Sequence, residues 1–139
     1  MLNDALTLPD SFLLLLKNAG PVTRRKALRK AVTYLKKENT RRIKANVEPD
    51  GSRMVHRKQG SRRMFQSISK QIKRVSRGDN AEFGFYGRTG WVASNHQYGR
   101  SVKTKTHDIP LPVRELLGIN DADQLVVRDI FLAELMGKL

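Results

Sequence analysis

One stretch of the chain decides the fold: residues 21–46, which read PVTRRKALRKAVTYLKKENTRRIKAN. After Pro21, whose fixed φ suits the first turn of a helix, the stretch contains neither glycine nor proline. The side chains that we expect on its buried face recur at steps of three and four residues, as on one side of a helix. They are Leu28, Ala31, Val32, Leu35, Asn39 and Ile43. The stretch therefore predicts a helix of about 24 residues and about 36 Å, with a narrow apolar stripe.

The remaining faces of this helix are basic, and so is the chain that follows it. Residues 21–78 carry 19 Lys and Arg side chains against three acids, a net charge of +16, whereas the whole 139-residue chain has a net charge of +14. A field of this kind attracts polyanions or an acidic protein surface, and added salt weakens the attraction. We expect a basic contact surface that includes Arg24, Arg25, Arg29, Lys36, Arg41, Arg57, Lys58, Arg62 and Arg63.

Short elements and turns flank the long helix. Before it, residues 12–17 predict a short helix, which Gly20 is placed to end. After it, the sequence Glu-Pro-Asp-Gly at residues 48–51 predicts a turn. Residues 52–61 predict an exposed basic loop, and residues 62–69 predict a further short helix.

The C-terminal half mixes strands with helices. Alternating side chains predict strands over residues 72–76 and 81–85, and the Gly-Asp-Asn turn between them indicates an antiparallel hairpin. Residues 87–90 begin and end with glycine, so they interrupt the alternating strand pattern. Residues 91–97 then predict a short helix with Gly99 as its C-terminal cap.

A polar loop, an edge strand and a last helix complete the chain. We expect the loop at residues 100–108 and the strand at 109–113, at an edge because its two prolines cannot donate hydrogen bonds. Asn120 or Asp121 should cap the last helix, and Asp121 and Asp123 in its first turn suit the helix dipole. Its predicted apolar stripe comprises Leu125, Val126, Ile130, Leu132, Ala133 and Met136.

Together these elements predict an α+β fold. It has a long N-terminal basic helix, a small antiparallel sheet with a hairpin, a short helix and a C-terminal helix. We expect a single domain over residues 1–139, composed of a helical arm (1–46), a basic loop with a short helix (47–70), and the sheet with the last helix (71–139). A chain of this length can bury about two-thirds of its unfolded surface and so form its own core.

The sequence holds no recognisable catalytic, cofactor or metal-binding motif. It has no cysteine, and His56, His96 and His107 lack the spacing of metal ligands. His96 lies at a helix end beside a glycine cap, where a structural or interface role is expected. The longest apolar run, residues 12–16, is far shorter than the roughly 20 residues of a membrane helix. We therefore expect no enzyme, no cofactor, no metal site and no membrane partner.

Several short motifs follow one another in a recognisable order. The basic helix leads to Pro-Asp-Gly at residues 49–51, Arg-Met-Phe at 63–65 and Glu-Phe-Gly-Phe-Tyr-Gly at 82–87. The most specific motifs are His-Gln-Tyr-Gly at residues 96–99, here the HQYG box, and Pro-x-Arg-x-Leu-Leu-Gly at residues 112–118, here the PxRxLLG box. In this order, over nearly the whole chain, the motifs resemble the phage virion morphogenesis family, the tail completion proteins of contractile-tailed bacteriophages.

The resemblance implies structural work without a cofactor. Proteins of this family complete the tail and help to join it to the head, as rings of subunits at the neck. The implied partners are further copies of the chain, in a ring expected to be a hexamer, and neck and tail proteins such as the tail tube, the sheath and the head–tail connector. DNA in the lumen is a further expected contact. The implied location is the virion, with assembly in the host cytoplasm.

The resemblance also assigns roles to the two boxes. Arg114 is expected to be an anchor, because its planar guanidinium suits carboxylates and carbonyls. The family tends to have proline after this arginine, where this chain has Glu115. The expected fold or interface residues are His96, Gln97, Tyr98, Gly99, Pro112, Arg114, Leu117 and Gly118.

The residues leave a second hypothesis open, a free nucleic-acid-binding protein that uses the basic segment 21–78. Its affinity for nucleic acid would fall steeply with salt. The long helix lacks both the heptads of a zipper and the flanking turn of a recognition helix. Phe83 and Phe85 share a strand face, and we expect them in the core rather than stacked on bases.

Overall fold

The computed structural model describes residue 14 and residues 17–137. In that part of the chain the elements are α2 (Pro21–Lys44), the 3-10 helix η1 (Ile68–Gln71), β1 (Lys73–Arg77), β2 (Asn80–Gly84), α3 (Gly87–Tyr98), β3 (Ser101–Lys103), β4 (Asp108–Pro110) and α4 (Asp121–Leu135). The strands form two separate antiparallel pairs, β1–β2 and β3–β4, so the predicted α+β class is confirmed. None of these helices is both long and apolar enough to cross a lipid bilayer. The short helix predicted over 12–17 falls mostly outside the described residues.

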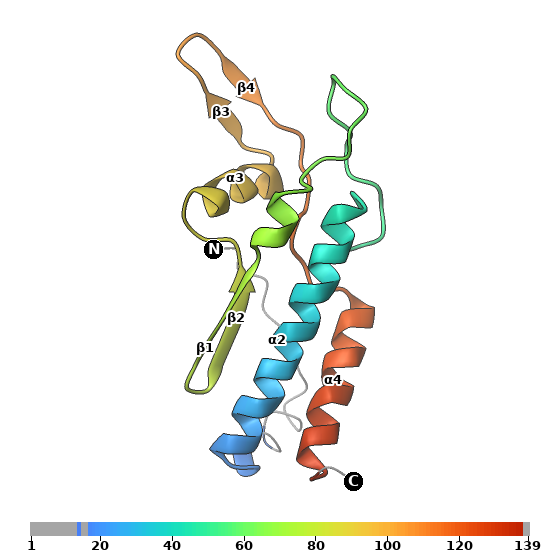
Figure 1. Cartoon of the computed structure of the whole chain (residues 1–139), viewed down its shortest axis with the longest axis vertical. Coiled ribbons are helices and arrows are strands. Elements are labelled where there is room, and N and C mark those ends of the chain that lie inside the picture. Colours follow the sequence, from blue (N-terminus) through green and yellow to red (C-terminus); the bar gives the residue numbers. More distant parts are fainter. Residues whose placement is uncertain (1–13, 15–16, 138–139) are drawn as a thin grey trace.

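The long helix α2 is the centre of the fold. Figure 1 shows α4 along one side of α2 and the β1–β2 hairpin along the other. Against α4, the small side chains Ala27 and Ala31 and the larger Leu35 pack on Val127 and Phe131, all of them buried. The predicted stripe of α2 is confirmed, because its buried residues include Ala31, Val32, Leu35, Asn39 and Ile43.

An ion pair lies at each end of the contact between α2 and α4. At one end, the Asp123 carboxylate accepts a 2.7 Å hydrogen bond from the guanidinium of Arg42, and the two side chains are 2% and 5% exposed. Asp123 also completes the predicted cap, because Asn120 and Asp123 each bond the other's backbone N–H with their side chains. At the other end, the buried Glu134 pairs with Lys30.

The buried face of α4 differs from the predicted one. Leu125 and Met136, from the predicted stripe, are 53% and 59% exposed. The prediction was right for Leu132, which packs against the cluster between α2 and α4, but it left out the apolar Val127 and Phe131. It also left out two acids, which are buried because cations of α2 neutralise them. The buried residues of α4 are Asp123, Val127, Phe131 and Glu134.

The predicted antiparallel hairpin is present as β1–β2, and it packs against α2. Val75 lies opposite Glu82 in the antiparallel register. Phe83 contacts both hydrophobic clusters of the protein and Phe85 is buried, so the expectation that they belong to the core is confirmed. The second hydrophobic cluster includes a residue from the last turn of α2. Its members are Ile43, Met54, Met64, Ile72, Phe85, Ala93, Leu116 and Leu117.

Two helix boundaries differ from those predicted. In place of the helix predicted over residues 62–69, a turn at residues 64–67 leads into η1, because Phe65 has a φ of +63°, which a right-handed helix cannot contain. Helix α3 begins earlier than predicted, at Gly87, so the glycines form its first turn instead of interrupting the chain. A Cβ on Gly90 would lie only 2.8 Å from the Phe85 carbonyl oxygen, so glycine permits this close approach.

A second hairpin replaces the predicted loop and edge strand. Within the predicted loop 100–108 lie β3 and the start of β4, which pair in antiparallel register, and β4 ends before most of the predicted strand 109–113. Two hydrogen bonds within the turn stabilise it. The Thr104 hydroxyl accepts the His107 N–H at 3.0 Å and donates to the His107 carbonyl at 2.9 Å. Side chains in this turn thus supply a local order that polar composition alone does not reveal.

The buried pair of Arg42 and Asp123 should be essential for stability. Asp123→Ala leaves a buried guanidinium without its carboxylate, a change that costs about 3–5 kcal/mol. We expect chemical denaturation to show a loss of this size in the free energy of unfolding. The control Asp129→Ala removes an exposed carboxylate of the same helix and should cost less than about 0.5 kcal/mol. Equal losses for the two variants would contradict this role.

Candidate functional site

The HQYG and PxRxLLG boxes meet at the end of α3. The buried amide of Gln97 binds three backbone groups of the second box. Its Oε1 accepts the N–H groups of Leu116 and Leu117 at 2.7 and 3.0 Å, and its Nε2 donates to the Leu117 carbonyl at 3.0 Å. The second box has no regular secondary structure, so no neighbouring strand pairs with these backbone groups. The Gln97 side chain provides their hydrogen bonds instead.

Two further residues of the HQYG box, His96 and Gly99, also contact the second box. The Arg114 N–H donates to the His96 carbonyl at 2.8 Å. Gly99 caps α3 with a φ of +63°, and a Cβ there would lie 2.7 Å from Cγ2 of Val113. Glycine is therefore required at this position both by the backbone conformation and by the close approach of the following segment.

The Arg114 side chain is buried, and the acceptors that the structure shows for its guanidinium are a carbonyl and a ring nitrogen. Its Nε donates to the Val55 carbonyl at 2.6 Å, and Nη1 donates to Nδ1 of His96 at 3.2 Å. Because arginine can only donate, Nδ1 accepts and the proton of the neutral imidazole is on Nε2. The edge of the Phe65 ring completes the surroundings of His96, with ring centroids 4.8 Å apart.

These surroundings lower the pKa of both His96 and Arg114. Burial and the positive charge of Arg114 lower the pKa of His96 below its usual value of 6.5. Burial, together with the nearby Arg57 charge, lowers the pKa of Arg114. A neutral His96 can accept a hydrogen bond from Arg114, whereas a protonated His96 could only donate and would repel the guanidinium.

The PxRxLLG box is also fixed to α2 and to the loop that follows it. The Gly118 N–H donates to Oδ1 of the buried Asn39 at 2.9 Å. The Glu115 N–H donates to the Glu48 carboxylate at 3.1 Å, a bond that the proline typical of the family could not make. The box therefore connects α2, α3 and the loop at one place.

The predicted box residues fall into two groups. His96, Gln97, Gly99, Arg114, Leu117 and Gly118 come together at this junction, where their contacts are within the fold. Tyr98 and Pro112 are exposed, and the Arg100 guanidinium lies over the Tyr98 ring, 4.9 Å from its centroid. Across the described ranges, no group of three or more His, Cys, Asp or Glu side chains is arranged to hold a metal ion.

The predicted basic residues are also divided. Arg24, Arg25, Arg29, Lys36 and Arg41 lie on α2, whereas Arg57, Lys58, Arg62 and Arg63 lie on the exposed loop beyond its C-terminal end. On α2, Arg24 pairs with Asp79 at the tip of the first hairpin, at 3.3 Å, and Arg41 pairs with Glu38 at 2.8 Å. The remaining cations of the helix include side chains that line a groove.

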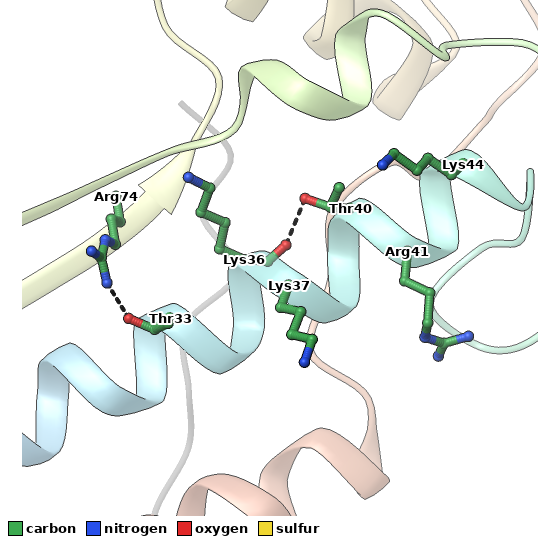
Figure 2. A pocket seen from close by; sticks show the side chains of 7 residues that line it. All are labelled: Thr33, Lys36, Lys37, Thr40, Arg41, Lys44 and Arg74. Carbon is green, nitrogen blue, oxygen red and sulfur yellow. Dashed lines mark hydrogen bonds between the residues drawn. The ribbon is translucent and has the colours of Figure 1, made fainter.

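This groove lies between α2 and β1 and has a volume of about 550 Å³. Figure 2 shows its lining, five cations and two threonines: Thr33, Lys36, Lys37, Thr40, Arg41, Lys44 and Arg74. The guanidinium of Arg74 donates to the Thr33 hydroxyl, which ties β1 to α2 across the groove. An open cavity with this lining can hold an anion through charge and hydrogen bonds.

The predicted basic contact surface left out three cations that line the groove. Lys37, Lys44 and Arg74 line the groove together with the predicted Lys36. Lys44 has the same helical spacing as the predicted cations, so the period of α2 could have found it. Arg74 lies on a strand, and its approach to α2 follows only from the packing of the hairpin.

Gln97 should contribute to stability through the three backbone groups that it bonds. Gln97→Ala leaves these groups buried without partners, and each such group costs about 1–3 kcal/mol. We expect the free energy of unfolding to fall by more than about 2 kcal/mol in chemical denaturation. Tyr98→Ala, in the exposed neighbour, is the control and should cost far less. A Gln97→Ala variant as stable as the control would contradict this assignment.

His96 should make the protein less stable in mild acid. Because its pKa is lowered in the fold, the unfolded state binds its proton more readily, and stability falls as pH drops below about 6.5. His96→Asn removes the titrating ring, so it should flatten the fall in melting temperature between pH 7.5 and 5. The exposed His107→Asn is the control and should keep the wild-type profile. A profile unchanged by His96→Asn would refute the prediction.

Comparison with known proteins gives the family of the chain. The tail completion protein S of Escherichia phage P2 is 29% identical over 135 aligned residues, which cover 87% of this chain and 90% of that protein. No solved structure matches the chain. Residues 8–136, which include both boxes, match the sequence profile of the phage virion morphogenesis family. The resemblance drawn from the motifs is thereby confirmed, and the chain belongs to the phage virion morphogenesis family.

Proposed function

We propose that this protein completes the phage tail and joins it to the head at the neck, as a structural subunit and without catalysis. The observation that carries the proposal is the family match over residues 8–136, together with a P2 relative named as a tail completion protein. The proposed location is accordingly the virion, reached by assembly in the host cytoplasm.

Several charged or titratable side chains form hydrogen bonds and ion pairs within the fold, and this supports a structural role. His96 accepts a hydrogen bond from Arg114, and Asp123 caps α4 and pairs with Arg42. Glu134 is buried and pairs with Lys30. Groups that could act as acids or bases thus hold elements of the fold together, and this use favours a scaffold over an enzyme.

Exposed apolar side chains support self-association into a ring. Trp91 and Tyr98, seven residues apart on one face of α3, are 60% and 50% exposed. Leu125 and Met136, on one line along α4, are also more than half exposed. A ring contact joins two unlike patches of neighbouring subunits, and these two patches lie on different elements. The proposed ring, of six subunits by analogy with the family, would contact the tail tube, the sheath and the head–tail connector.

A phage that lacks its own copy of this protein tests the proposal. We expect electron micrographs of the lysate to show heads and tails that are not joined, and the wild-type protein supplied in trans should restore complete virions. Trp91→Ala combined with Tyr98→Ala should lower the yield of joined particles at least about tenfold, since aromatic side chains carry much of an interface's affinity.

Lys70→Ala provides the matched control, because it truncates an exposed long side chain of η1 outside both apolar patches. It should leave the yield unchanged. Normal numbers of joined virions in the complete absence of the protein would overturn the proposed role. Full complementation by the double variant would overturn the ring contact through α3.

A further inference from the structure

Two hollows follow one another along the side of α2 that faces the β1–β2 hairpin. The first is the groove of Figure 2, and the second, of about 340 Å³, lies nearer the N-terminal end of the helix. Arg25 and Arg29 line the second hollow together with residues from the tip of the hairpin. We call the cations along both hollows the basic seam: Arg25, Arg29, Lys36, Lys37, Lys44 and Arg74.

The charge of the basic seam is not neutralised within the fold. In the described part of the chain, Lys36, Lys37 and Lys44 have no carboxylate within ion-pair distance. Among the lining residues described for the two hollows, none is acidic. Nearby acids are already engaged, because Glu38 binds Arg41 and Asp79 binds Arg24 at the hairpin tip. The seam therefore presents an unbalanced row of positive charge.

A second copy of the chain is a poor source of the anion that would match this row. Residues 79–139 hold eight acids against seven Lys and Arg side chains, so a second copy brings little negative charge to offer. Four of these acids already form ion pairs within the fold, namely Asp79, Asp123, Asp129 and Glu134. Two copies that met through the seam would instead bring two chains of net charge +14 together.

The lining favours phosphates over a protein partner. In the two hollows as described, no aromatic side chain is present, and the apolar ones are Val22 and Leu28 at one end. Protein interfaces depend on packed aromatic and apolar anchors, and single-stranded nucleic acids stack their bases on aromatic rings. Arg, Lys, Ser and Thr side chains, which dominate here, are the usual contacts of phosphate oxygens.

The length of the seam also fits a stretch of duplex. From Arg25 to Lys44 the helix rises about 28 Å. One strand of B-form DNA carries about eight phosphates over that distance. Six cations along the seam can thus neutralise most of the phosphates that one strand presents to it.

We propose that the basic seam between α2 and the β1–β2 hairpin binds the phosphodiester backbone of double-stranded DNA without reading its sequence. The seam provides charge and hydrogen-bond donors, which contact phosphate oxygens and carry no sequence information. This inference is independent of the tail-completion role, because it rests on the charge and shape of α2 and the hairpin alone.

Fluorescence anisotropy with the purified full-length protein and a 30-base-pair duplex of mixed sequence tests the inference. The logarithm of the association constant should fall linearly with the logarithm of the salt concentration, with a slope of about 0.9 per phosphate contacted. The triple variant Lys36→Gln, Lys37→Gln and Lys44→Gln should reduce the magnitude of this slope by about 2 to 3. A scrambled duplex should bind equally well.

The matched control is the triple variant Lys58→Gln, Arg62→Gln and Arg63→Gln, which removes the same charge from the exposed loop. It should keep the wild-type slope, and thermal melting should show both triple variants folded. Equal loss in the two variants would mean that net charge alone attracts DNA and would overturn the site. Absence of duplex binding, or tighter binding of poly-glutamate or single-stranded DNA at the same salt, would overturn it as well.

Discussion

The peptide groups of residues 114–118 lie between helices without a strand partner, and the fold depends on how they are satisfied. Buried N–H and C=O groups must find partners, and here side chains of two helices provide them. Gln97 of α3 bonds Leu116 and Leu117, and Asn39 of α2 bonds Gly118. These bonds have specific lengths and directions, so they fix the distance between α2 and α3 at the point where the second hydrophobic cluster is formed.

The cations of α2 serve two different purposes, according to their position around the helix. Those that face α4 are neutralised, since Arg42 binds Asp123 and Lys30 binds Glu134 at opposite ends of the helix pair. These pairs set the register of α2 against α4, while Ala27 and its neighbours between them provide the apolar contact. On the side of the first hairpin, Lys36, Lys37 and Lys44 have no such partner among the described residues. Position on the helix, rather than net charge, thus separates structural cations from those available to a ligand.

The sequence predicted the elements whose signals are local. The period of α2, the alternation of the first hairpin, the Gly99 cap and the Asn120 cap all appear in the structure. What it missed depended on contacts between distant residues. Hydrophobicity could not place Asp123 on the buried face of α4, because this carboxylate is buried through its bond to an arginine 81 positions away. The six box residues at the junction were identified by motif, but the geometry that joins them required the fold.

An unbalanced row of cations also has an energetic consequence for the isolated subunit. Like charges along one helix face repel, and this repulsion lowers the stability of the folded chain. A polyanion that binds the folded state along the basic seam relieves the repulsion and stabilises the fold by mass action. The tie between Arg74 and Thr33 keeps β1 beside α2, so the shape of the seam is present before the ligand arrives. The fold therefore provides the geometry of the site, and the ligand provides the charge that the fold lacks.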